Sequence, residues 1–197
     1  MNKLYLLFTI TERARSEEFT AVFKPLVPVF WQINAQGTAS GDILDYLGLE
    51  ESEKKIYITV CETHAAKNIL NSLVQDLMID VPGNGIAFTV PLSSIGGRKA
   101  LELVTLGQEE IDKEEQTLKG TEYEIILAVA NQEYTELVME AARKANASGG
   151  TVIHAKGTQT KEAEKFLGMT LAEEKGIVLI LTKTEEKNEI MQAIIHE

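Results

Sequence analysis

Two stretches of the chain decide the fold: residues 33–60, INAQGTASGDILDYLGLEESEKKIYITV, and residues 153–180, IHAKGTQTKEAEKFLGMTLAEEKGIVLI. The two stretches align without a gap at an offset of 120 residues. Self-similarity at a fixed offset is typical of a repeated structural unit. We therefore interpret the chain as two copies of one unit. The first-copy residues that meet an identical partner are Ile33, Ala35, Gly37, Thr38, Leu47, Gly48, Glu53 and Lys55.

The second copy predicts alternating strands and helices. Continuous apolar runs at 123–130 and 176–183 are typical of buried strands, and 151–156 predicts a strand between them. The segment 131–147 has apolar residues at helical spacing, with Asn131 as its expected N-cap and Gly149-Gly150 as its stop. A second helix is expected from residue 185 onward.

The first copy repeats this order and adds a fourth strand at 86–92, after a helix at 65–78. The order β-α-β-β-α-β predicts an α+β chain of two tandem ferredoxin-like domains, the second without its last strand. We expect domain 1 at 1–97, a linker at 98–120 whose charged stretch 107–120 is a solvated helix, and domain 2 at 121–197. A sheet without its edge strand leaves backbone groups unpaired. Either the chain is truncated or another segment fills that place.

The composition narrows the classes of function. Among 197 residues the formal net charge is −11, which disfavours binding to nucleic acid. Cys61 is the single cysteine and lies in an apolar strand, so we expect an inert buried thiol. The apolar runs are too short for a membrane helix, and a cytoplasmic location is the expectation.

Signals for catalysis are weak. His64, His154 and His196 are scattered without the spacing of metal ligands, so we expect no metal site. A serine or cysteine beside a histidine does not occur in a recognisable frame. We therefore expect a protein that is not an enzyme.

The ordered set GGTVIHAKGT, FLGMTLAEEKGIVLILT and NEIMQAI in the second copy, with PGNGIAF in the first, resembles the PII nitrogen-regulatory family. The resemblance implies a signalling protein that forms homo-oligomers, with a trimer favoured. Its effector would bind between domains, with ATP, ADP, AMP or 2-oxoglutarate as candidates and no fixed cofactor. Segments at about 38–52 and 158–174 would contact a regulated protein partner, for which a membrane transporter is the family expectation.

The same resemblance implies the effector-binding residues. Some of them stand where the second strand of each copy ends, and Thr151 stands where the family has a threonine near the adenine. The others, at 83–85, form a glycine turn that would cradle phosphates. Ile86 and Ala87 stand where the family has a lysine. The implied residues are Gln36, Gly37, Thr38, Gly83, Asn84, Gly85, Thr151, Lys156, Gly157 and Thr158.

Two other interpretations stay open at this stage. The absent lysine favours a structural assembly that has kept the fold without the ligand. A pair of amino-acid-sensing domains would have the same order of elements. Trp31 stands where the second copy has Thr151, and its ring either fills the first ligand cleft, packs in the core or stacks on a base.

Overall fold

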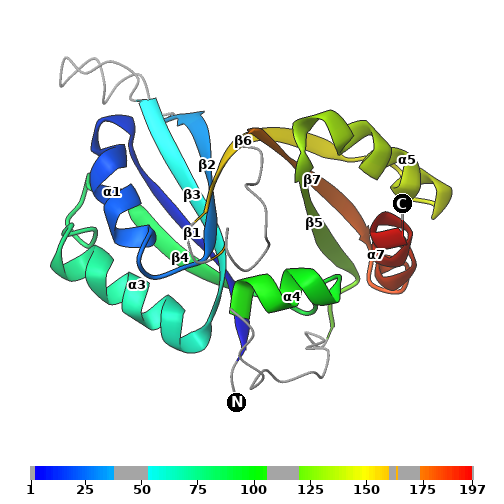
Figure 1. Ribbon diagram of the computed structural model, residues 1–197, viewed down its shortest axis with the longest axis horizontal. Coiled ribbons are helices and arrows are strands. Elements are labelled where there is room, and N and C mark those ends of the chain that lie inside the picture. The colour runs from blue at the N-terminus through cyan, green and yellow to red at the C-terminus, as the bar shows by residue number, and fades with distance from the viewer. Residues whose placement is uncertain (1–2, 38–52, 106–119, 160–162, 164–173, 197) are drawn as a thin grey trace.

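The computed structural model describes residues 3–37, 53–105, 120–159, 163 and 174–196. Over these residues it is an α+β structure of one seven-stranded sheet and five α-helices (Figure 1). The strands are β1 (Leu4–Glu12), β2 (Val29–Gln36), β3 (Glu53–Glu62), β4 (Ile86–Pro91), β5 (Tyr123–Asn131), β6 (Thr151–Gln159) and β7 (Glu174–Lys183). The helices are α1 (Ser16–Phe23), α3 (Thr63–Gln75), α4 (Arg98–Thr105), α5 (Thr135–Lys144) and α7 (Lys187–His196), with 3-10 turns η1 (Arg13–Arg15) and η2 (Gln132–Tyr134) before α1 and α5.

The sheet joins both halves of the chain. Its strand order is β4-β1-β3-β2-β6-β7-β5, and the neighbouring strands pair antiparallel. The first four strands have the ferredoxin-like arrangement predicted from the sequence. The order β6-β7-β5 repeats three strands of that arrangement. Strand β5 is an edge of the sheet within the described part of the chain.

The junction between the halves is a short ladder between β2 and β6. Val29 to Gln32 pair with Gln159 to Lys156. This ladder explains why β6 extends three residues beyond the strand predicted at 151–156. Gly157 and Thr158 therefore lie inside the sheet, not in a loop. Thr38 and most of the two segments between strands lie outside the described residues.

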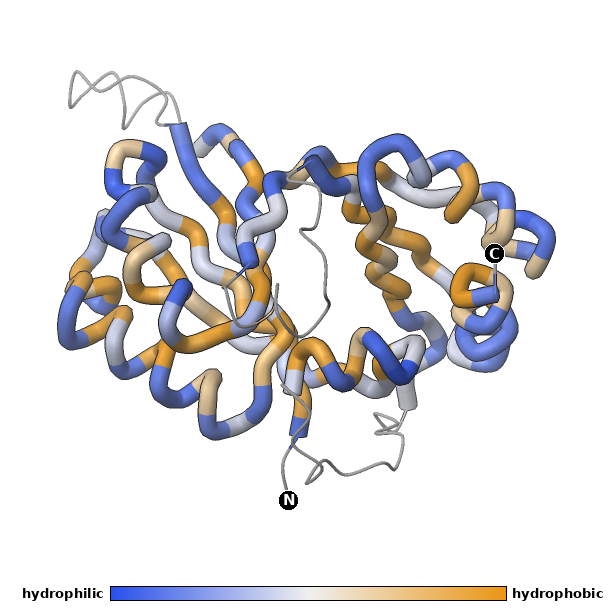
Figure 2. Tube along the Cα trace, in the orientation of Figure 1, coloured by the Kyte–Doolittle hydropathy of each residue, from blue (hydrophilic) through white to orange (hydrophobic). Residues whose placement is uncertain are grey.

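Three apolar clusters hold the structure together. Helices α1 and α3 cover the outer side of the first half around Phe23, Tyr57 and Ile69. Helices α5 and α7 cover the outer side of the second half around Ala142, Val178 and Ile190. Figure 2 shows hydrophobic residues along the strands and polar residues on the outer surfaces of the helices. Burial of these side chains supplies the main favourable term in folding.

The third cluster lies on the opposite side of the sheet, called here the inner side. It combines strand residues of both halves, such as Leu6, Ile58 and Ile177, with Val104 of α4. Helix α4 lies against this side in Figure 1. The predicted linker at 98–120 thus begins with a helix whose Val104 and Thr105 are buried, ahead of the charged stretch 107–120 that we expect to be a solvated helix. Residues 106–119 lie outside the described part.

Two helix-end predictions need correction. Helix α5 ends at Lys144, five residues before Gly149, because Asn146 adopts a positive φ of 68° that stops the helix. Asn131 precedes η2 but makes no side-chain capping hydrogen bond. Its carboxamide is occupied elsewhere, by Lys175. Asn146, rather than Gly149-Gly150, thus stops the helix, and Asn131 binds Lys175 instead of capping the helix.

The segment after β4 packs against the second half. Ser93 Oγ donates to Glu124 Oε2 at 2.6 Å, and Lys187 Nζ lies 3.3 Å from that carboxylate oxygen and from Ser93 Oγ. A Cβ on Gly96 would stand 2.9 Å from Ile195 Cδ1, so this glycine permits a close approach to α7. A segment of the first half thus covers part of the region beside β5.

None of the helices in the described residues is both long and apolar enough to cross a membrane. Cys61 is buried as predicted, and burial raises the pKa of its thiol to about 12.

Candidate functional site

The β6 residues of the predicted site lie at the junction of the two halves. Lys156 pairs with Gln32 on one side and with Glu174 on the other. Gly157 and Thr158 pair with Trp31 and Phe30. The backbone of these three residues belongs to the sheet ladder, so the side chains that they can offer to a ligand are those of Lys156 and Thr158.

The first-copy residues lie at a different place. Gln36 is the last residue of β2 and pairs with Glu53, and Gly37 follows it. Because β2 and β6 run antiparallel, Gln36 lies toward the beginning of β6, away from Lys156. The two copies of the motif therefore do not form one site. Thr151 is exposed at the beginning of β6 and lines a hollow of about 280 Å³ with Ile125, Gly149, Gly150, Leu179 and Leu181.

The turn Gly83–Gly85 is held by its own hydrogen bonds. The Asn84 side-chain amide donates to the Met78 carbonyl at 2.9 Å, and the Asn84 carbonyl accepts from Thr11 Oγ1 at 3.3 Å. Gly83 and Gly85 have φ of 95° and 140°. The Asn84 backbone N–H is already bonded to Val81 O. This turn fastens β4 to the end of β1, and its amide at Asn84 is used within the protein.

Three cations gather on the outer side of the junction. Alternation along the strands places Lys55 of β3 and Lys156 of β6 on the side that faces the helices. Burial lowers the pKa of Lys55, and the positive charges of Arg13 and Lys156 lower it further. Lys55 Nζ donates to Asn34 Oδ1 at 2.8 Å. Positive charges from both halves therefore meet here, in a chain of net charge −11.

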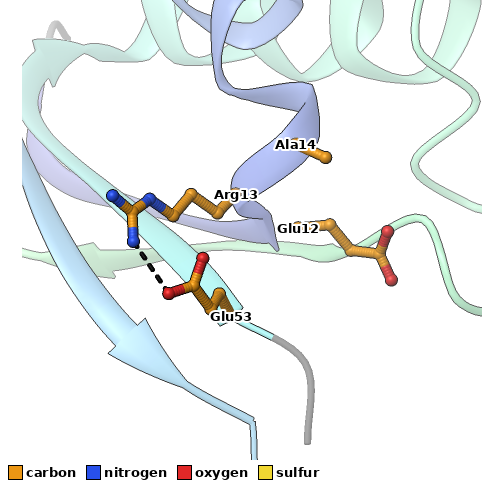
Figure 3. Close-up of a pocket in the computed structure, with 4 residues that line it drawn as sticks. All are labelled: Glu12, Arg13, Ala14 and Glu53. Atoms are coloured by element: carbon orange, nitrogen blue, oxygen red, sulfur yellow. Dashed lines mark hydrogen bonds and ion pairs between the residues drawn. The ribbon is translucent and has the colours of Figure 1, made fainter. Parts of the chain in front are cut away.

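An open hollow of about 380 Å³ lies beside Arg13 and is lined by Glu12, Arg13, Ala14 and Glu53. Figure 3 shows the Arg13 guanidinium directed at Glu53, while the Glu12 carboxylate points away from that pair. Arg13 Nη1 and Glu53 Oε1 are 2.9 Å apart, and both side chains are largely exposed. An exposed pair of this kind is weak. An incoming anion can compete with Glu53 for Arg13.

Of the residues in this cluster, only Lys156 belongs to the predicted site. The repeat matches Lys55 with Lys175 but predicts no role for it, and Arg13 carries no pattern of its own. Three cations close together are unusual in an acidic chain and would have indicated this site. Their proximity, however, can be recognised only once the pairing of β3, β2 and β6 is known. Groups of three or more potential metal ligands do not occur among the described residues.

The comparisons with known proteins are limited. No protein-family model matches the sequence, and no curated protein matches it. The divalent ion tolerance protein CutA1 from Ehrlichia chaffeensis is similar in structure over 54% of this chain and 96% of its own, with 12% identity and a TM-score of 0.37. The regulatory subunit of aspartate kinase from Thermus thermophilus, in its ligand-free form, is similar over 98% of this chain and 90% of its own, with 9% identity and a TM-score of 0.40. Scores and identities this low do not establish a common family or a shared function.

Proposed function

We propose that this chain is a tandem PII-like regulatory protein that binds a small anionic effector at the junction of its halves. The observation that supports it best is the convergence of Arg13, Lys55 and Lys156. A bound phosphate or carboxylate would relieve their mutual repulsion through charge-assisted hydrogen bonds. The candidate effectors are ATP, ADP, AMP and 2-oxoglutarate.

Internal duplication supports this proposal. β1 and β5 both have nine residues and correspond at an offset of 119, since Leu4 matches Tyr123. β3 and β7 both have ten and correspond at 121, since Glu53 matches Glu174. Trp31 of β2 pairs with Ile58, and Thr151 of β6 pairs with Leu179, which is the residue that corresponds to Ile58. The offset between β2 and β6 is therefore 120 residues. Equal strand lengths and equal pairings are what two copies of one domain would have.

The cluster would couple the halves because its members come from both. Arg13 and Lys55 belong to the first half, and Lys156 belongs to the second. A ligand that bridges them favours one relative position of β2 and β6 and so shifts the population of conformations. We propose that the segments linking β2 to β3 and β6 to β7 pass this change to a partner protein, without catalysis. A cytoplasmic homo-oligomer, a trimer as the resemblance favours, is part of the same proposal.

Isothermal titration calorimetry of the full chain against ATP, ADP, AMP and 2-oxoglutarate tests the proposal. We expect at least one to bind, and Lys156→Gln and Lys55→Gln to weaken that binding about tenfold or more each, since each removes a charged hydrogen bond. Lys67→Gln, on the exposed surface of α3, is the matched control and should bind as the wild type does.

Two results would contradict the proposal. One is the absence of binding for all four compounds. The other is binding that Lys156→Gln and Lys55→Gln leave unchanged, which would place the ligand elsewhere. Multi-angle light scattering measures the oligomeric state in the same samples, and a strict monomer with and without ligand would refute the trimer.

A further inference from the structure

Lys175 is a buried cation on the inner side of the sheet. It lies in β7 with 6% of its surface exposed. Its strand neighbours on the same side are Ile177 and Leu179, which belong to the apolar cluster that includes α4. Lysine is rarely buried to this extent unless a partner compensates its charge.

The first half shows what that partner would be. Lys54 pairs across the sheet with Glu12 and Ala35, as Lys175 pairs with Asn131 and Ala155. Lys54 Nζ lies 3.8 Å from Glu12 Oε1, which gives it a carboxylate counter-ion. In the second half asparagine occupies the position of that glutamate. In the part of the chain that the structure describes, the more deeply buried lysine therefore lacks the carboxylate counter-ion that the more exposed lysine has.

The Lys175 ammonium donates a hydrogen bond to Asn131 Oδ1. Within the described ranges, no carboxylate lies within 4.0 Å of it. Burial lowers the pKa of Lys175. Among the described residues the Lys175 ammonium thus has one neutral acceptor and no carboxylate counter-ion, and a buried charge without a counter-ion is costly.

We propose that Lys175 and Asn131 form a binding site for the carboxylate of a small molecule with an apolar body. The carboxylate supplies the missing charge at Lys175, in the place that Glu12 takes beside Lys54. The Asn131 amide nitrogen donates to its second oxygen. Ile153 and Val129 lie on the same side of the sheet, are only partly buried and suit the apolar body.

A single ammonium matches a monocarboxylate better than a phosphate dianion. A dianion would retain one uncompensated charge among apolar side chains, which is unfavourable. This site is separate from the effector cluster, because Lys156 points to the opposite side of the sheet. The inference therefore does not rest on the proposed function, and either can fail alone.

The test uses the full chain with ¹³C-labelled lysine and 3-methylbutanoate as the probe. We expect the Lys175 ε-carbon signal, assigned by its loss in Lys175→Met, to shift in a saturable way. 3-Methylbutan-1-ol, which has the same apolar body without the carboxylate, should leave it unmoved. Inorganic phosphate at the same concentration should bind at least about tenfold more weakly.

The informative variant is Asn131→Glu, which restores the pairing of the first half. It should supply the counter-ion internally, leave the chain folded and weaken 3-methylbutanoate binding by at least about tenfold. Lys54→Met serves as the control and should bind the probe as the wild type does. Unchanged affinity in Asn131→Glu, equal binding of the alcohol or of phosphate, or an unmoved Lys175 signal would each overturn the inference.

Discussion

The two halves also contact each other away from the sheet, and we expect substitutions in this contact to destabilise the protein. Lys187 of α7, Glu124 of β5 and Ser93 after β4 form one polar cluster. The Lys187 side chain is 4% exposed and that of Glu124 is 16% exposed. Glu124→Gln preserves the shape and removes the negative charge. It removes the Glu124 carboxylate from beside the buried Lys187 ammonium.

The size of the effect follows from this burial. Removing one partner of a buried pair costs about 3–5 kcal/mol, because the other charge remains desolvated. Some solvent reaches Glu124, so we expect about 3 kcal/mol in the free energy of unfolding. For a chain of this length that corresponds to a fall in Tm of roughly 6–12 °C. Removing both charges in Glu124→Gln/Lys187→Met should recover most of the loss, since no charge then stays unpaired.

Urea unfolding measures these energies. Trp31 is the single tryptophan and lies in the β2–β6 ladder, so its fluorescence reports on the junction. Circular dichroism follows both halves together, and coincident curves would justify a two-state treatment. Glu102→Gln is the matched control: it breaks an ion pair with Arg98 whose side chains are 90% and 38% exposed. Such a pair contributes less than about 1 kcal/mol.

The reasoning fails in two ways that the experiment can show. The free energy of unfolding of Glu124→Gln could lie within about 0.5 kcal/mol of that of Glu102→Gln, which would mean that water already screens the pair. Alternatively, the double variant could be as unstable as the sum of the two single variants. That result would show that Lys187 and Glu124 do not compensate each other.

Three further predictions concern single positions in the first half. Gly85→Ala should lower the free energy of unfolding by about 2 kcal/mol or more in urea titrations, because its φ is 140° and a Cβ would stand 2.5 Å from the Ile10 carbonyl oxygen; an unchanged midpoint would contradict this account of the turn. Tyr57→Phe should cost about 1 kcal/mol, because the hydroxyl donates to Ser16 O at 2.6 Å. Burial raises the pKa of Tyr57, so the unfolded chain ionises first; stability should hold below about pH 10 and fall above it in the wild type, and fall less in Tyr57→Phe. Cys61, whose pKa burial raises to about 12, should react with iodoacetamide at pH 8 only after unfolding, and rapid labelling of the folded chain would show that the core opens.

The repeat in the sequence was enough to predict the order of elements and the ferredoxin-like arrangement. Apolar runs such as 123–130 and 176–183 indicate strands whatever surrounds them. The ends of elements were less predictable, because they depend on partners. β6 continues to Gln159 because β2 offers a ladder there, and α5 ends early because Asn146 adopts a positive φ.

The register of the second copy could not be found by sliding the sequence. The ungapped offset matches Lys55 with Lys175, yet the ladders match Lys54 with Lys175. A shift of one residue turns a strand side chain to the other face of the sheet. Lys55 therefore lies on the outer side with the cation cluster, and Lys175 lies on the inner side in an apolar cluster. Identical letters in the alignment correspond to different environments.

The candidate site was only partly predictable for a related reason. Lys156 could be selected from a motif, but its partners Arg13 and Lys55 are distant in sequence and carry no motif. The glycines of the motif, by contrast, are used by the fold. Gly157 lies in the ladder opposite Trp31, and Gly85 clears the Ile10 carbonyl. A recurring glycine indicates a backbone constraint, and the sequence alone does not separate a constraint from a ligand contact.

The differences between the halves are informative because equivalent strands in the two halves pair in the same way. Glu12 corresponds to Asn131 by strand pairing, and the lysine opposite has a carboxylate counter-ion in the first half and none among the described residues in the second. Trp31 corresponds to Thr151, and the first position is half-buried in the inner apolar cluster while the second is exposed beside a hollow. Both substitutions remove a group that would fill or neutralise the inner side of the second half. Packing alone would favour keeping such groups, since unfilled and uncompensated positions cost stability. The small-molecule site proposed at Lys175 would account for this difference between the halves.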